Sequence, residues 1–180
     1  MHTHVALLRG INVSGQKLIK MAPLRTSCEA LGFKDVKTYL QSGNLVFRCA
    51  ETSAPGLGAK IARKILADFG HAVVILLRTP DELESVVKGN PLRQLEGLDE
   101  DRWYVTFLSE PAPSSAEERL RPLAAKTERF AISGREIYLH CPEGYGNTKF
   151  SNNAIEKKLS LPATTRNWRT IKALLALARE

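Results

Sequence analysis

Residues 36–47 read VKTYLQSGNLVF, and this segment decides how the first half of the chain folds. Two short runs rich in β-branched and aromatic residues flank the polar turn residues Gln-Ser-Gly-Asn, a pattern typical of a hairpin. The segment therefore predicts a strand at 36–40, a turn at 41–44 and a second strand at 45–47.

An amphipathic helix is predicted on each side of this hairpin. The helix before it has Pro23 near its first turn and is stopped by Gly32, and the helix after it opens at Pro55 and is stopped by Gly70. Each helix carries an apolar stripe at helical spacing. The stripes are Met21, Leu24, Cys28 and Leu31 in the first helix and Leu57, Ile61, Ile65 and Phe69 in the second.

Two continuous apolar runs lie outside the helices, at Val5–Leu8 and at 72–77, and both have the length of a strand. The order over the first 79 residues is then β-α-β-β-α-β, the ferredoxin-like split unit. We therefore expect an α+β protein whose residues 1–79 form an N-terminal ferredoxin-like subdomain.

The second half predicts a similar but less complete set of elements. After a short helix to about Lys88, the pattern predicts a strand at 103–108, a helix at 116–125, a hairpin at 130–140 and a helix that ends at Leu159. A last helix is expected from Asn167, capped by Thr164 or Thr165. Residues 80–180 are thus expected to form a second ferredoxin-like subdomain with extra C-terminal helices. The two halves would then be an imperfect structural duplication, although no residue-level repeat supports it.

The composition bounds the class of protein. Of 180 residues, 43% are hydrophobic and 25% are charged, which is typical of a globular chain with a packed core. No apolar run approaches the ~20 residues that cross a bilayer, and no secretory signal opens the chain, so we expect a cytoplasmic protein with no membrane partner. The three cysteines are far apart and predict neither a disulfide nor a zinc site.

The net charge of +7 is concentrated in two segments. Residues 9–25 carry four cationic side chains and no acid, and residues 144–172 carry six cationic side chains against one glutamate. If these segments meet, they would attract anions. The alternative is two solvated loops that happen to be basic.

The loop after the first strand resembles a phosphate-binding loop without fulfilling its requirements. A Walker motif needs lysine directly after its last glycine, followed by Ser or Thr, whereas Gln16 intervenes and Leu18 replaces the hydroxyl. An NTPase is therefore not expected. Small residues and cations still suit an anion. The alternative is a turn whose glycines serve only its conformation. The candidate ligand-binding residues of this loop are Arg9, Gly10, Asn12, Gly15 and Lys17.

Further candidate ligand-binding residues lie in three other polar segments. They are Ser42 and Asn44 in the hairpin turn, Lys149 in a Gly/Asn-rich loop before a helix, and Arg166 and Asn167 at the start of the last helix. Ordinary turn and capping roles are the alternative for each of them. We expect the loop at 9–17, the loop at 149–151 and the start of the last helix to face one shared cleft. No catalytic group, metal site or cofactor is indicated by any motif.

Several of these segments together carry a resemblance to a known family. They are Val-Ala-Leu-Leu-Arg-Gly-Ile-Asn-Val at 5–13, residues 21–33, Tyr-Leu-Gln-Ser-Gly-Asn at 39–44 with Val-Phe at 46–47, and Thr-Thr-Arg-Asn-Trp at 164–168. The chain resembles the family catalogued as domain of unknown function 1697, in which Tyr is commoner where Val5 stands here. The resemblance implies a bacterial-type α+β fold with two ferredoxin-like subdomains and implies no activity.

One departure from the family pattern concerns a candidate residue. Relatives more often have Ser-Lys-Leu where this chain has Thr148-Lys149-Phe150, so the lysine and the hydroxyl are kept. The resemblance therefore leaves Lys149 as a candidate ligand-binding residue.

Three classes of function follow from the charge pattern and the fold. The first is the binding of a small anionic or nucleotide-like ligand in a basic cleft between the subdomains. The second is RNA binding, because ferredoxin-like sheets recognise RNA, although the third strand lacks the exposed aromatic residues of that module. The third is an enzyme acting on an anionic substrate. Neither a cofactor nor an oligomeric state follows from the sequence.

Overall fold

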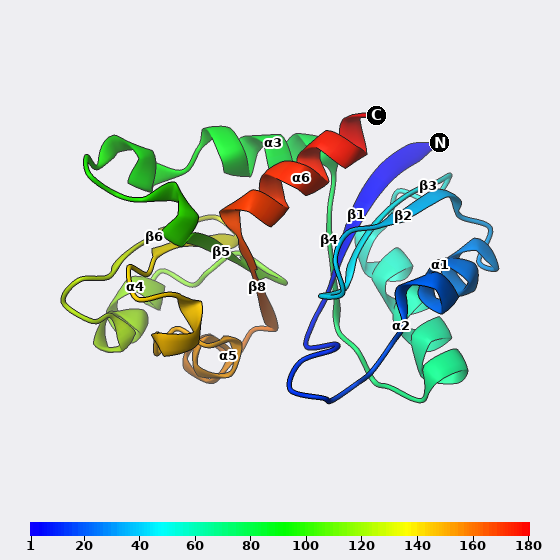
Figure 1. The fold of residues 1–180 in the computed structure, drawn as a ribbon, viewed down its shortest axis with the longest axis horizontal. Coiled ribbons are helices and arrows are strands. Elements are labelled where there is room, and N and C mark those ends of the chain that lie inside the picture. The colour runs from blue at the N-terminus through cyan, green and yellow to red at the C-terminus, as the bar shows by residue number, and fades with distance from the viewer. The chain divides into compact units, whose positions relative to one another are not determined.

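The computed structural model describes residues 1–180 and divides into two compact units. The first unit contains residues 1–84 together with 173–180, and the second contains residues 85–172. Each unit holds one four-stranded antiparallel sheet (Figure 1). The chain is therefore an α+β protein, as the sequence predicts. The last eight residues return to the first unit, whereas the sequence-based division assigned the whole tail to the second half.

In the first unit the strands are arranged in the order β2-β3-β1-β4. The central pair has Val5 of β1 opposite Val46 of β3, and the other neighbour of β1 is β4. The elements are β1 (His2–Leu8), α1 (Met21–Glu29), β2 (Lys34–Thr38), β3 (Asn44–Cys49), α2 (Ala54–Phe69), β4 (Ile75–Arg78) and the start of α3 (Pro80–Lys88).

Helices α1 and α2 lie on the same side of this sheet, and the core of the unit fills the space beneath them (Figure 1). Leu24 of α1 and Ile61 of α2 are fully buried there against Phe47 of β3. Alternate residues of β1 point to the opposite face, where Val5 and Leu7 are also fully buried. Both faces of the sheet are thus covered, which explains why β1 is a continuous apolar run.

In the second unit the strands are arranged in the order β6-β7-β5-β8. The elements are α3's last residues, β5 (Trp103–Leu108), α4 (Ala116–Leu120), β6 (Arg129–Ser133), β7 (Glu136–His140), α5 (Asn152–Leu159), β8 (Ala163–Asn167) and the start of α6 (Trp168–Arg179). Short 3-10 helices lie at 91–94, 100–102, 121–123 and 145–147. The core under α4 and α5 contains Leu120, Phe150 and Ile155, all fully buried.

The two units repeat one topology, down to the register of their strands. In the first, Val5 of β1 lies opposite Arg78 of β4, and in the second, Val105 of β5 lies opposite Arg166 of β8. Both arginines are buried, and each lies just before the residue that caps the next helix. Thr79 accepts a hydrogen bond from the amide of Glu82 at 3.2 Å in α3, and Asn167 accepts one from the amide of Thr170 at 2.8 Å in α6. The second unit therefore also has the order β-α-β-β-α-β.

Strand β8 corrects one expectation from the sequence. Thr164 and Thr165, expected to cap the last helix, lie inside this strand, and Asn167 is the capping residue. The segment follows Pro162 and contains no alternating apolar residues, so its sequence resembles a loop. Tertiary pairing with β5 makes it a strand.

Candidate functional site

Seven of the candidate residues belong to the first unit, and the structure brings them together at one end of its sheet. They are Arg9, Gly10, Asn12, Gly15, Lys17, Ser42 and Asn44. Loop 9–20 connects β1 to α1, and turn 39–43 connects β2 to β3. The two segments are joined directly, because the amide of Leu8 donates to the carbonyl of Gly43 at 2.8 Å.

Asn12 holds loop 9–20 in its conformation. Its Nδ2 donates to the carbonyl of Ile19 at 2.9 Å and to the carbonyl of Gln41 at 2.6 Å, and its Oδ1 accepts from the amide of Ile19 at 2.8 Å. One side chain therefore closes the loop upon itself and ties it to the neighbouring turn. Every polar atom of the Asn12 amide is used in this way, so its role in the structure is to shape the loop.

Gly43 and Asn44 shape the adjoining turn. Gly43 has a φ of 79°, and a Cβ at this position would lie 2.7 Å from Cβ of Leu8 and 2.8 Å from Cγ1 of Ile11. The fully buried Asn44 donates through Nδ2 to the carbonyl of Tyr39 and to Oγ of Ser42, both at 2.9 Å. The turn is thus packed against the loop and cannot accept a larger residue at Gly43.

Left-handed backbone is concentrated in loop 9–20. Asn12, Ser14 and Lys17 have φ values of 54°, 51° and 46°, alternating with the left-handed Gly10 and Gly15. Each non-glycine residue in this region costs about 1 kcal/mol or more, and such strain persists only where the surrounding structure imposes it. The exposed amides of Ser14 and Gly15 have no acceptor in the protein. Successive amides in such a loop form a concavity that suits an anion.

The charged side chains of residues 9–28 are all positive. No Asp or Glu occurs between residues 9 and 28. Lys17 donates to the carbonyl of Ala72 at 2.7 Å while remaining exposed, and Lys20 is exposed at the N-cap of α1. No side chain caps this helix and no acid lies in its first turn, so its positive end adds to the cations nearby.

The other three candidates, Lys149, Arg166 and Asn167, lie in the second unit. Lys149 is exposed in the loop before α5. Arg166 is buried on β8, where it donates to Oγ1 of Thr164 at 2.7 Å and to the carbonyl of Thr165 at 2.9 Å. Burial lowers the pKa of this guanidinium to about 10. The shared cleft expected from the sequence joins residues of different units and stays a prediction.

Sequence reasoning missed a polar network in the second unit. Oγ1 of Thr165 donates to Oδ1 of Asn152 at 2.7 Å, accepts from the hydroxyl of Tyr145 at 3.1 Å, and lies 2.7 Å from Oγ1 of Thr106. In the sequence, only the Gly/Asn-rich composition of residues 144–153 indicated this polar network. Hydroxyl groups of β5, β8 and the loop meet only because the strands pair in this register.

The titratable groups of the cores give no further site. Burial raises the pKa of Cys28 to about 12 and that of Cys141 to about 11, so both thiols stay protonated and unreactive. Burial also lowers the pKa of His4 and His140 below the usual value. No three His, Cys, Asp or Glu side chains gather closely enough to hold a metal ion. None of the helices is both long and apolar enough to span a membrane.

The fold and the loop define an α+β protein with two four-stranded antiparallel sheets, one of which carries a strained, basic loop after its first strand. The chain belongs to the family described as "Protein of unknown function (DUF1697)", whose model matches residues 1–138. It is also similar to the solved structure of the conserved bacterial protein SP0830 from Streptococcus pneumoniae, with a TM-score of 0.75 and 22% identity over 98% of each chain. This likeness shows the fold alone. No curated protein matches the chain.

Proposed function

We propose that the protein is a binding module for a small anionic or nucleotide-like ligand, held at loop 9–20. The observation that carries this proposal is the run of left-handed residues at Gly10, Asn12, Ser14, Gly15 and Lys17, which the Asn12 side chain holds in place. Strained backbone clusters at binding and active sites because selection for stability alone would remove it.

The electrostatics of the loop support an anion as the ligand. The amides of Ser14 and Gly15 are free, and Lys17, Lys20 and the N-terminus of α1 add positive charge, while residues 9–28 contain no carboxylate. Gathering like charges costs free energy, and a bound anion would offset that cost. A phosphate group is the form of anion that backbone amides at a helix start accept most readily.

The burial of both sheets argues against the RNA-binding alternative. An RNA-recognition sheet stacks bases on exposed aromatic side chains of its central strands. The corresponding face here carries Val5, Leu7 and Val46 in the first unit and the buried Phe107 and Tyr138 in the second. An enzyme acting on an anionic substrate stays an alternative prediction, although residues 9–28 supply no His, Asp or Glu that could act as a base.

The test is an amide NMR titration with inorganic phosphate and with adenosine 5′-monophosphate, read at Ser14 and Gly15. We expect saturable shifts at both amides in the wild-type protein. In the Lys17→Ala/Lys20→Ala variant the affinity should fall about tenfold or more, since a hydrogen bond to a charged group contributes about 1.5–3 kcal/mol.

The matched control is Lys126→Ala/Lys157→Ala, which removes the same charge from exposed positions of the second unit. This variant should bind as the wild type does. Unchanged shifts at Ser14 and Gly15 in wild-type protein at millimolar ligand would remove the proposal, and so would equal affinity in the two lysine variants.

We also infer that both units are ferredoxin-like. The inference is supported by the order β-α-β-β-α-β and by the strand arrangements 2-3-1-4 and 6-7-5-8, with helices on one face of each sheet. A cytoplasmic location is proposed as well, since Cys28, Cys49 and Cys141 are all free, as in reducing compartments. Fractionation of cells expressing the protein tests the location.

A further inference from the structure

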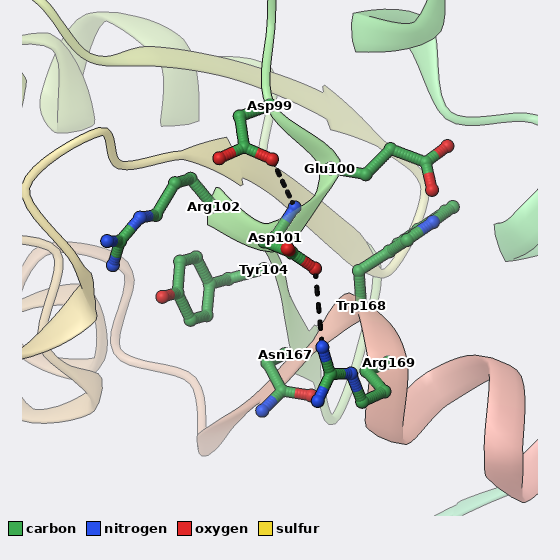
Figure 2. Close-up of a pocket in the computed structure, with 8 residues that line it drawn as sticks. All are labelled: Asp99, Glu100, Asp101, Arg102, Tyr104, Asn167, Trp168 and Arg169. Atoms are coloured by element: carbon green, nitrogen blue, oxygen red, sulfur yellow. Dashed lines mark hydrogen bonds and ion pairs between the residues drawn. The ribbon is translucent and has the colours of Figure 1, made fainter.

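A pocket of about 380 Å³ lies in the second unit, where β5 begins and β8 passes into α6 (Figure 2). This volume is within the range of small-molecule sites. It was not expected from the sequence, which singled out only Asn167 among its residues. The pocket is lined by Asp99, Glu100, Asp101, Arg102, Tyr104, Asn167, Trp168 and Arg169.

Three side chains bring unused hydrogen-bond donors to this pocket. Arg102 and Tyr104 are two residues apart, and Tyr104 lies directly opposite Asn167 in the β5–β8 pair. The guanidinium of Arg102 and the hydroxyl of Tyr104 make no hydrogen bond in the protein, and Nδ2 of Asn167 is free because only its Oδ1 caps α6. Figure 2 shows Arg102 and Tyr104 extending toward the same side of the pocket. The Arg102 and Tyr104 donors together suit one anionic group.

The carboxylates of the pocket are not equivalent. Glu100 pairs with Lys172 at 3.2 Å and Asp101 pairs with Arg169 at 3.5 Å. Oδ1 of Asp99 accepts a hydrogen bond from the amide of Asp101 at 2.9 Å, and Oδ2 makes no hydrogen bond in the protein. In Figure 2 the Asp99 carboxylate lies on the far side of the pocket from Asn167. The pocket therefore offers one free acceptor group, on the far side from Asn167, and three free donor groups.

The aromatic residues do not provide a platform for a base. Trp168 is only 3% exposed and packs its ring edge-on to Trp103 at 5.4 Å. The ring of Tyr104 packs against the ring of Tyr145 at a tilt of 32°, with centroids 5.3 Å apart. A ligand that fits must therefore be held by hydrogen bonds along its length. A chain or ring that carries hydroxyl groups can donate a hydrogen bond to the Asp99 carboxylate, whereas a flat apolar ring has no aromatic face to stack on.

We propose that this pocket binds a small polyhydroxylated molecule with one anionic group, of the sugar phosphate class. Arg102 and Tyr104 bind the anionic group, Asn167 donates to a hydroxyl oxygen of the sugar, and Asp99 accepts a hydrogen bond from another hydroxyl. The site shares no residue with loop 9–20, and its existence does not depend on the function proposed for that loop.

The experiment is a titration with ribose 5-phosphate, inorganic phosphate and ribose, read by NMR at the Nε–H of Arg102 and at the side-chain amide of Asn167. We expect ribose 5-phosphate to bind about tenfold or more tightly than phosphate, since one further hydrogen bond to a charged group discriminates by that factor. Arg102→Ala should lose both ligands. Asp99→Asn keeps the oxygen that caps Asp101, and it should bind ribose 5-phosphate no better than phosphate.

Arg121→Ala is the matched control, because this exposed arginine lies in the same unit outside the pocket. It should bind both ligands as the wild type does. Equal affinity for phosphate and ribose 5-phosphate in the wild type would overturn the proposal, as would an unchanged affinity in Arg102→Ala or Asp99→Asn. If phosphate shifts are absent at Ser14 and Gly15 but the pocket binds as expected, the function proposed for loop 9–20 is wrong and the pocket proposal is unaffected.

Discussion

Replacing Asn12 should show how much of loop 9–20 depends on one side chain. Asn12→Ala removes two donated hydrogen bonds and one accepted bond. A net hydrogen bond contributes about 1 kcal/mol, so three contribute about 3 kcal/mol. Water can reach the carbonyl of the exposed Gln41 and repair part of that loss. Alanine, however, tolerates the φ of 54° less well than asparagine does, which adds about 1 kcal/mol. We expect a total destabilisation of about 3 kcal/mol.

Two companion variants separate the contributions. Asn12→Gly loses the same hydrogen bonds without the steric cost, so it should be more stable than Asn12→Ala by about 1 kcal/mol. Asn12→Asp keeps an acceptor for the amide of Ile19 but places a carboxylate against the carbonyls of Ile19 and Gln41, so we expect it to be as unstable as Asn12→Ala.

Urea unfolding gives the free energies, and amide hydrogen exchange at Ile19 reports whether the loop opens locally. In Asn12→Ala this amide should exchange faster even where the rest of the first unit stays protected. A loss below about 1 kcal/mol with unchanged exchange at Ile19 would refute the role assigned to Asn12.

Two further predictions concern packing and pH. Gly43→Ala should destabilise the first unit by about 3 kcal/mol or more, because its Cβ would clash with Leu8 and Ile11 at a φ of 79°; an unfolding midpoint close to that of the wild type would contradict this. Burial lowers the pKa of His140 in the folded protein, an effect that Asp99 partly offsets. As the pH falls, the unfolded chain therefore binds a proton at His140 before the folded protein does. Stability should therefore fall as the pH drops below about 6.5 toward the folded pKa. This slope should be smaller in His140→Phe, in urea titrations at pH 7.5 and 5.5, with the buried His4 supplying what remains.

The elements with strong local signals were predicted correctly from the sequence. Helix α2 begins near Pro55 and ends at Gly70, which has a φ of 72°, and β5 has the bounds that its apolar run predicts. Both are set by residues close together in the chain. The strand expected from Ala72 begins instead at Ile75, because the residues before it form the connection that accepts bonds from Arg9 and Lys17.

The site was predicted less well than the fold, for a physical reason. The sequence marks loop 9–20 through its glycines and its charge, but the bond from Asn12 to Gln41 spans 29 residues and depends on how β1 and β3 pair. The pocket in the second unit depends likewise on Tyr104 lying opposite Asn167. Strand β8 had to be recognised before that pairing could be foreseen, and its Thr-Thr-Arg-Asn sequence gives little sign of a strand.

The repeated topology bears on the history of the chain. If both units descend from one ancestral half, their connections after the first strand were once alike, yet they now have 12 residues at 9–20 and seven at 109–115. The copies then diverged unequally. One copy now has the shorter connection, and the other has a longer, cationic segment that the Asn12 side chain closes upon itself. On that descent, a half-length ancestor would have had to self-associate to present two such units, whereas in a single chain each copy can change alone.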